Sequence, residues 1–139
     1  MRLQIGDLRF TIYDVRFKGE FDAMNKYELK ERFKQNAIKT AFFVMKLPFN
    51  IVNKNYSDQL NRSASGAGAN YSAALRGKST ADFLNKLKIV EEELDESLFF
   101  LELIEAVNPA LKDEIAILTK EKSELLAIIV STIKTLRSK

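Results

Sequence analysis

The first 23 residues have a different pattern of apolar and polar positions from the rest of the chain. Apolar residues alternate with polar ones at Leu8, Phe10, Ile12, Val15 and Phe17. A period of two is typical of extended chain, and an isolated hairpin is only marginally stable in water. We therefore expect 1–23 to be an N-terminal extension, either a β-hairpin that docks or pairs, or a loose segment. Met24 is an alternative natural start of the chain.

From about Lys26 the apolar positions recur at helical intervals. The first helix is predicted to bury a stripe of Phe33, Ala37, Ala41 and Val44, with Ile38, Phe42 and Met45 on the adjoining track. Leu47-Pro48 ends it, because proline disfavours helix in the residue before it. The second helix is predicted to begin near Ser57 or Asp58, which can cap it, and to end at Gly77. Its stripe is Leu60, Ala64, Ala67, Tyr71 and Ala74.

The third helix carries the most regular heptad pattern in the chain. Ser79 to Asp82 resembles a capping box that starts it, and its core positions are Phe83, Leu87, Val90, Leu94, Ser97, Leu101 and Ile104. Asn108-Pro109, an N-cap followed by a proline at the first helical position, predicts the start of a fourth helix. The stripe of that helix is Leu111, Ile115, Leu118, Leu125, Ile129, Ile133 and Leu136.

Four helices with short connections predict an all-α fold, an antiparallel up-down-up-down four-helix bundle over 24–139. Composition agrees, because the 139 residues include only 5 glycines and 2 prolines. There is no cysteine and no histidine, which excludes disulfides, thiolate nucleophiles, Cys/His zinc sites and histidine-based catalysis. We therefore expect no enzymatic activity, no catalytic residue and no cofactor.

Charge is unevenly distributed along the chain. The net charge is +3, but 79–108 carries eight acidic and two basic side chains while the segments on either side are basic. Such a dipolar arrangement suits either self-complementary packing or an anionic partner met on one face; the alternative is that each face is merely solvated. No segment has the length of a membrane span or the pattern of a signal peptide, so we expect a cytoplasmic protein.

Small residues are concentrated in the second helix, where 62–71 reads Arg-Ser-Ala-Ser-Gly-Ala-Gly-Ala-Asn-Tyr. Glycine is unfavourable inside a helix, so we expect the small side chains to allow a close approach between helices.

The second and third predicted helices carry a family resemblance. The motifs that carry it are Gln59-Leu60-Asn61-Arg62-Ser63-Ala64, Gly68-Ala69-Asn70-Tyr71, Ser79-Thr80-Ala81-Asp82-Phe83, Lys86-Leu87-Lys88-Ile89, Glu93, Glu96-Ser97 and Leu101-Glu102-Leu103. Together these motifs resemble the 23S rRNA-intervening-sequence proteins.

The resemblance covers about 24–137. It implies a bacterial four-helix bundle that assembles into a ring-shaped homo-oligomer, typically a pentamer, without established enzymatic activity. A related branch, the accessory variability determinants of diversity-generating retroelements, works with a reverse transcriptase and RNA. The chain departs from the family at Ala73, where glutamate is common, and at Glu92, where lysine is usual. The first departure weakens any carboxylate-based site, and the second argues against RNA contact through the third helix.

Arg62, Asn70, Glu93 and Glu96 form the predicted structural polar cluster. Glu93 and Glu96 share a helix face, but a di-metal site in a bundle needs Glu-x-x-His motifs and further carboxylates, so we expect no metal. Arg62 can bridge carboxylates, and we expect it to pair with Glu93 or Glu96 beside Asn70.

Two surface features remain. The adjacent rings of Phe42 and Phe43 are expected to diverge, as are those of Phe99 and Phe100, so one ring of each pair is predicted to face water. All four are candidate residues of a homo-oligomer interface. The alternative is that the rings cap the bundle or lie under 1–23. The candidate RNA-binding residues are a lysine stripe on the first helix and two basic residues at the end of the second: Lys26, Lys30, Lys34, Arg76 and Lys78.

Taken together, the sequence predicts a non-enzymatic, homo-oligomeric bundle associated with RNA or a ribonucleoprotein. The alternative is a protein-interaction scaffold that binds a partner such as a reverse transcriptase.

Overall fold

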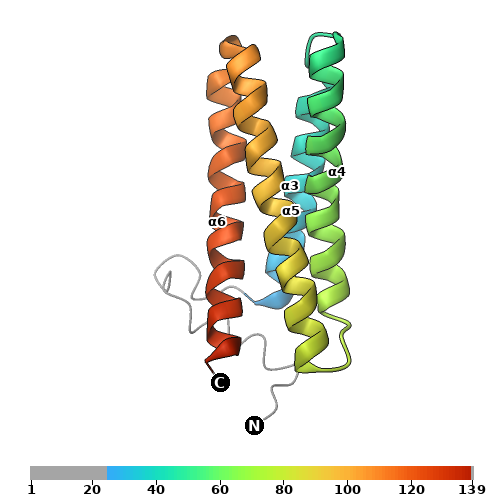
Figure 1. Cartoon of the computed structure of the whole chain (residues 1–139), viewed down its shortest axis with the longest axis vertical. Coiled ribbons are helices and arrows are strands. Elements are labelled where there is room, and N and C mark those ends of the chain that lie inside the picture. Colours follow the sequence, from blue (N-terminus) through green and yellow to red (C-terminus); the bar gives the residue numbers. More distant parts are fainter. Residues whose placement is uncertain (1–24, 139) are drawn as a thin grey trace.

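Four long antiparallel helices make up the part of the protein that the computed structural model describes, residues 25–138. They are α3 (Lys26–Met45), α4 (Ile51–Ala74), α5 (Thr80–Val107) and α6 (Lys112–Arg137), with a short 3₁₀ turn, η2 (Pro109–Leu111), before α6. Figure 1 shows that successive helices run in alternating directions, and no strand occurs within 25–138. The predicted all-α, up-down-up-down bundle is confirmed. The expectations for 1–23 and for Met24 lie outside the described residues.

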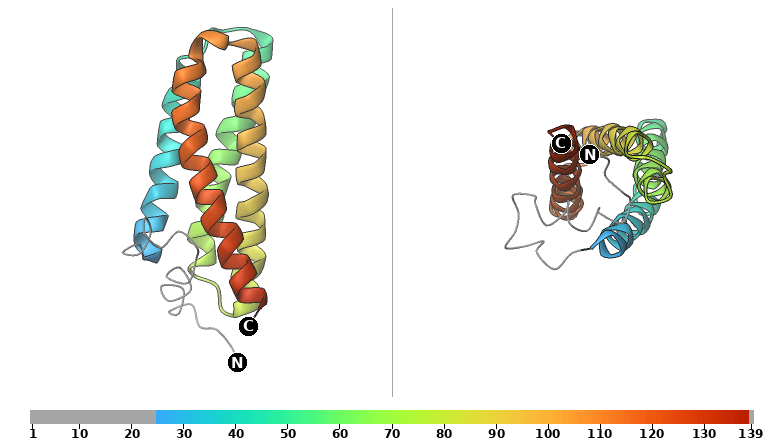
Figure 2. Two further views of the ribbon diagram at one scale, coloured as in Figure 1. Left: turned by 90° about the vertical axis from the view of Figure 1, so that its left-hand side faces the viewer. Right: turned by 90° about the horizontal axis from the view of Figure 1, so that it is seen from below.

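The helices are arranged in the order α3, α4, α5, α6 around the bundle (Figure 2). Each packs on its neighbour in the chain, whereas α3 and α6 diverge toward the end where α3 begins and α6 stops. The contact between α4 and α5 is the most extensive. Small residues on the buried face of α4, including Ala64, Ala67 and Ala74, favour such close helix packing.

Short polar side chains cap the first three helices. Asn25 accepts hydrogen bonds from the backbone amides of Tyr27 and Glu28 at 2.9 and 3.0 Å. Ser79 accepts one from the Asp82 amide at 3.1 Å, as the capping pattern predicted. These bonds satisfy amides that have no partner within their own helix.

The second helix begins earlier than the sequence analysis predicted. It starts at Ile51 rather than near Ser57 or Asp58, because Asn50 caps it by accepting a hydrogen bond from the Asn53 amide at 2.8 Å. The helix ends at Ala74, three residues before Gly77, and Gly77 does not have a positive φ.

Asn108 does not cap the fourth helix as predicted. Its side chain makes no capping bond and instead exchanges hydrogen bonds with Asn53, donating at 2.8 Å and accepting at 3.1 Å. Asn53 also donates to the Pro48 carbonyl at 2.9 Å. This amide pair joins the α3–α4 loop to the α5–α6 loop, so Pro109 begins a 3₁₀ turn and α6 starts only at Lys112.

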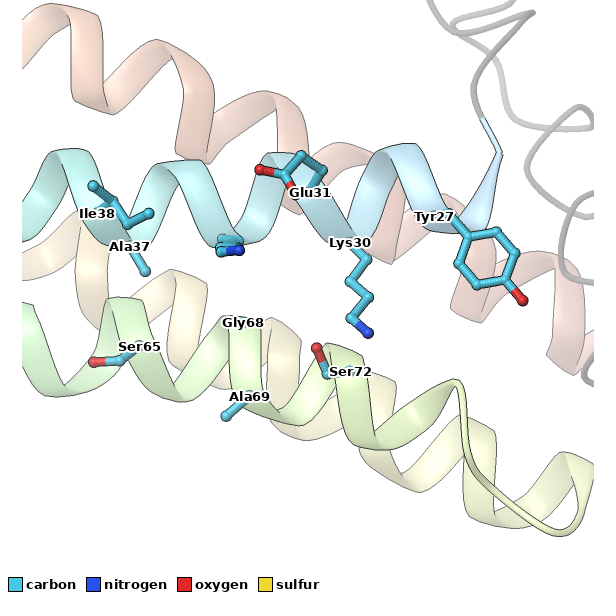
Figure 3. Close-up of a pocket in the computed structure, with 10 residues that line it drawn as sticks. Tyr27, Lys30, Glu31, Ala37, Ile38, Ser65, Gly68, Ala69 and Ser72 are labelled. Atoms are coloured by element: carbon cyan, nitrogen blue, oxygen red, sulfur yellow. The ribbon is translucent and has the colours of Figure 1, made fainter.

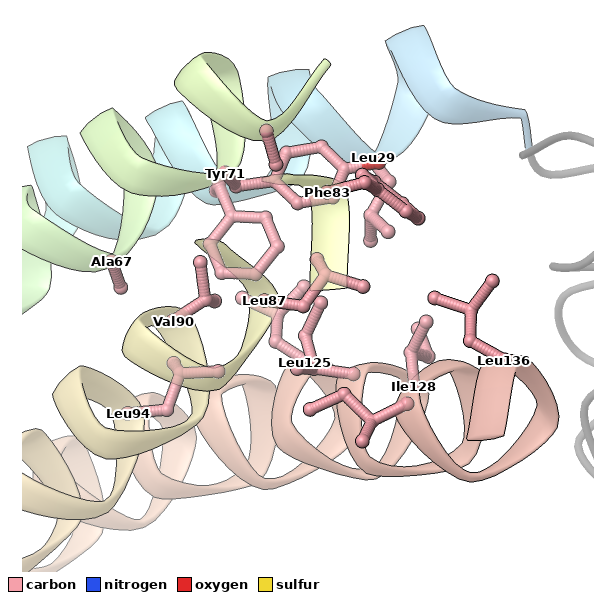
Figure 4. Close-up of a cluster of buried hydrophobic side chains, with 14 residues drawn as sticks. Leu29, Ala67, Tyr71, Phe83, Leu87, Val90, Leu94, Leu125, Ile128 and Leu136 are labelled. Carbon is pink, nitrogen blue, oxygen red and sulfur yellow. The ribbon is translucent and has the colours of Figure 1, made fainter. Parts of the chain in front are cut away.

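The interior contains two apolar clusters. The lower cluster, shown in Figure 4, lies toward the end of the bundle where α3 begins and comprises Leu29, Phe33, Ala67, Tyr71, Ala74, Phe83, Leu87, Val90, Leu94, Leu125, Ile128, Ile129, Ile133 and Leu136. The upper cluster comprises Phe43, Leu60, Leu101, Ile104, Ile115 and Leu118. All seven predicted core positions of α5 are buried, and so are the five predicted for α4.

The stripe predicted for α3 is wrong by a rotation of the helix. Its buried residues are Leu29, Phe33, Asn36, Thr40 and Phe43, whereas the predicted Ala37, Ala41 and Val44 are only half-buried. The true seam contains two polar residues, and the sequence analysis followed the more apolar track beside it. The adjoining track is exposed: Phe42 is 62% and Met45 76% accessible.

Candidate functional site

A groove with a basic wall runs between α3 and α4. It has a volume of about 570 Å³ and is lined by Tyr27, Lys30, Glu31, Lys34, Ala37 and Ile38 from α3 and by Ser65, Gly68, Ala69 and Ser72 from α4. Figure 3 shows Ala37 and Lys30 pointing from α3 toward α4, with the Lys30 ammonium directed toward Ser72. Charge and shape therefore come from α3, and the open floor comes from the small side chains of α4.

The five candidate RNA-binding residues fall into separate places. Lys30 and Lys34 line the groove, are exposed, and form no ion pair with any residue in 25–138. Lys26 is half-buried, with its ammonium 5.3 Å from the centre of the Tyr27 ring. Arg76 and Lys78 lie in a different depression, between the end of α4 and the start of α5. The structure thus brings Lys30 and Lys34 together in the groove, whereas Lys26 does not line it and Arg76 and Lys78 lie elsewhere.

The polar cluster is a surface ion pair. Arg62 donates to Glu96 at 2.9 Å and to Gln59 at 2.6 Å, so it makes one of the two pairings expected. The Arg62 side chain is 60% exposed, and an ion pair this exposed contributes about 0–1 kcal/mol. Asn70 lies outside the cluster, donating instead to the Gly66 carbonyl at 2.9 Å.

Glu93 sits beside Gly66 rather than in an ion pair. A Cβ on Gly66 would lie 2.6 Å from a Glu93 carboxylate oxygen, so the glycine leaves room for that carboxylate. Partial burial raises the pKa of Glu93, the nearby Glu96 carboxylate raises it further, and Arg62 opposes the shift. Gly66 therefore leaves room for a side chain. The sequence analysis had proposed that the small residues let two helices approach closely, and Gly66 does not have that role.

Gly68 can be replaced by alanine without a clash. A Cβ there would lie 3.6 Å from the Phe33 carbonyl oxygen, an ordinary contact. We expect Gly68→Ala to raise the free energy of unfolding by about 0.5–1 kcal/mol, because alanine is the better helix former. Gly66→Ala should gain less, because the Glu93 carboxylate must move. Urea unfolding of the two variants checks this, and an equal or larger gain at Gly66 would contradict it.

One ring of each phenylalanine pair is exposed, as predicted, but the Phe99 and Phe100 rings do not diverge: they are in edge-to-face contact, with ring centres 5.3 Å apart. Phe42 and Phe99 are 62% and 53% exposed. Phe43 is buried in the upper cluster, and Phe100 packs against that cluster, with its ring 6.1 Å from Tyr56. Phe43 and Phe100 are therefore core residues, which corrects their assignment to the candidate interface.

Sequence reasoning missed a buried polar layer between the two apolar clusters. We define this polar layer as the buried polar side chains that separate the clusters along each helix: Asn36, Thr40, Ser63, Ser97 and Lys122. The signal was present, because Lys122 is four residues after Leu118 and three before Leu125 and so lies on the apolar stripe of α6. The sequence analysis passed over that position.

Lys122 is the centre of the polar layer. Its ammonium nitrogen is completely buried and donates to Asn36 Oδ1 at 2.7 Å and to Thr40 Oγ1 at 3.0 Å. No aspartate or glutamate in 25–138 is buried. The nearby Glu121 binds Arg32 in a half-buried network that also includes Glu124. Burial lowers the pKa of Lys122 to about 7, although Glu121 opposes the shift. The layer fixes α6 against α3 by hydrogen bonds, where apolar contact between these two helices is limited.

Within the described residues, no group of three or more acidic side chains is arranged to hold a metal ion. Over the same range, none of the helices is both long and apolar enough to span a membrane.

The bundle is similar to a solved structure of a bacterial protein. A crystal structure of a protein of unknown function from the S23 ribosomal protein family of Bacteroides thetaiotaomicron superposes with a TM-score of 0.70 and 26% sequence identity, covering 80% of this chain and 99% of that one. No protein-family model matches the chain. No curated protein matches it.

Proposed function

We propose that the protein is a non-enzymatic, homo-oligomeric bundle that associates with RNA through the exposed basic face of α3. The observation that carries the proposal is the position of Lys30 and Lys34, which are one helical turn apart, exposed, and without an ion pair in 25–138. Exposed lysines without an ion pair attract phosphates, and their binding releases the counterions that surround the RNA. The likeness to a member of the S23 ribosomal protein family also supports the proposed RNA association.

Self-association would strengthen a weak basic site. One subunit presents only a few lysines, and repeating them around a ring raises the effective concentration of binding sites along one RNA strand. Exposed Phe42 and Phe99, on different helices, supply apolar surface for contacts between subunits. Two different patches suit a head-to-tail contact, and such contacts form a ring, here the proposed pentamer, when the rotation between subunits closes.

A charge-reversal pair tests RNA association. We expect Lys30→Glu/Lys34→Glu to weaken binding of a labelled oligouridine of about 12 nucleotides by about tenfold or more. The matched control is Lys112→Glu/Lys120→Glu, which changes the net charge equally at exposed positions of α6. Equal loss in both double variants, or no RNA binding by the unmodified protein, would overturn the proposal.

Light scattering tests the assembly. We expect the full chain to have a mass several times that of one subunit, and Phe42→Ser/Phe99→Ser to shift it toward the monomer because the apolar contact is lost. An unmodified protein that is monomeric at micromolar concentration would contradict the ring.

A protein-binding scaffold is the second candidate function. It is favoured by Phe99, which is exposed on α5 between acidic residues at Asp95 and Glu102. A basic protein with an apolar patch, such as a reverse transcriptase, fits that surface. Loss of partner binding in Phe99→Ser with RNA binding intact would favour this candidate.

A further inference from the structure

The groove between α3 and α4 has features that a flat basic face lacks. Its floor is formed by α4 residues that recur at each turn and have side chains no larger than a serine: Ser65, Gly68, Ala69 and Ser72. Its α3 wall carries Tyr27 near one end, 66% exposed, and Ile38, 38% exposed, further along. The groove therefore offers a recess, an aromatic ring and two ammonium groups together.

The polar groups of the groove leave positive charge available. Glu31 is its one acidic side chain, and the Gln35 amide donates to that carboxylate at 2.9 Å. Lys30 is directed across the floor toward the Ser72 hydroxyl (Figure 3). Lys34 lines the same wall one turn further on, about 6 Å along the helix axis. A similar distance separates the two phosphates on either side of one nucleotide in an extended strand.

We propose that this groove binds single-stranded RNA, with a base stacked on Tyr27 and the adjoining phosphates at Lys30 and Lys34. The inference rests on the proposed RNA association and specifies its site. Unpaired bases stack on exposed aromatic rings, and lysines track the backbone beside them. The floor accepts the ribose and backbone because no long side chain projects from it, and Ser72 offers a hydroxyl there.

Duplex RNA fits this groove less well. In a duplex the bases are stacked on one another and paired, so no base is available for Tyr27. A duplex would contact only the ammonium groups and leave the recess unused. The geometry therefore predicts a preference for single strands, which charge alone does not.

A groove-filling variant tests the proposal without altering charge. We expect Ala69→Leu to weaken binding of oligouridine by about fivefold or more, because the longer side chain occupies the floor. Ala116→Leu makes the same change at an exposed position of α6 outside the groove and should bind as the unmodified protein does. Tyr27→Ala should show a similar loss, and Tyr27→Phe should retain binding because it keeps the ring.

A duplex of the same length, measured alongside, separates this inference from the proposed function. The unmodified protein should prefer oligouridine, and Ala69→Leu should abolish the preference while duplex binding is unchanged. If the protein binds both RNAs equally and the groove variants bind normally, the groove proposal is wrong while RNA association stands. If neither RNA binds, both fail. If Ala69→Leu instead changes the subunit mass, the groove holds a second copy of the chain, and the proposal is also wrong.

Discussion

The free energy of unfolding should increase by about 3–5 kcal/mol between pH 7 and pH 10.5, and Lys122→Met should abolish that increase. The cause is the buried amine of Lys122, whose pKa burial lowers from 10.5 to about 7. Between these two values the unfolded chain holds a proton at Lys122 that the folded protein has released. Stability therefore increases with pH across this window.

Outside the window Lys122 contributes no pH dependence. Below about pH 7 both states are protonated, and the folded state must keep a buried ammonium with only neutral partners, Asn36 and Thr40. Above pH 10.5 both states are neutral. The negative charge of Glu121 on α6, which pairs with Arg32 on α3, opposes the lowering of the Lys122 pKa without cancelling it.

Urea unfolding at several pH values, followed by far-UV circular dichroism, measures the effect. The quantity to compare is the difference in unfolding free energy between the unmodified protein and Lys122→Met, because the titration of surface groups cancels in it. Lys120→Met, at an exposed position two residues earlier, is the matched control and should keep the pH dependence. A constant difference between pH 7 and pH 10.5 would show that Lys122 keeps its proton in the folded protein.

Tyr71→Ala should lower the free energy of unfolding by about 3–5 kcal/mol. The Tyr71 ring is fully buried in the lower cluster and stacks on Phe33, with ring centres 4.8 Å apart. This stack fixes the first half of α3, which carries Lys30 and Lys34, against α4. The variant should therefore also weaken RNA binding, because it loosens the wall of the groove.

Tyr71→Phe separates the ring from its hydroxyl. The hydroxyl donates to the Lys26 carbonyl at 3.4 Å, a long hydrogen bond, so its removal should cost less than about 1 kcal/mol. Denaturant midpoints of the two variants provide the measurement. A loss in Tyr71→Phe as large as that in Tyr71→Ala would mean that the hydroxyl, rather than the stack, fixes α3.

The fold could be predicted wherever apolar spacing was regular. In α5 the heptad from Phe83 to Ile104 identified every buried position. In α3 the same method failed because Asn36 and Thr40 occupy the seam, and their burial depends on Lys122, which is 86 residues away from Asn36 in the chain. A single helix contains no sign of such a partner. The early start of α4 was missed for a different reason, because its cap is local: Asn50 accepts from the Asn53 amide, and the sequence analysis considered only Ser57 and Asp58 as caps.

The candidate site could be predicted only in part. The Lys30–Lys34 spacing placed both lysines on one face of α3, and the small residues of α4 were recognised. These two features form a groove only because of the way in which α3 packs on α4. The α3 stripe that the sequence analysis predicted was rotated, so it would have placed the lysines differently relative to α4. The sequence also gave no reason to separate Arg76 and Lys78 from the α3 lysines.

The salt dependence of RNA binding tests the central claim most directly. For the unmodified protein, the logarithm of the association constant for oligouridine should fall linearly with the logarithm of salt concentration. In Lys30→Gln/Lys34→Gln the slope should be smaller in magnitude by about 1.4, because two phosphate contacts are lost. A slope unchanged by that substitution would contradict the account, because the α3 lysines would then contact no phosphate.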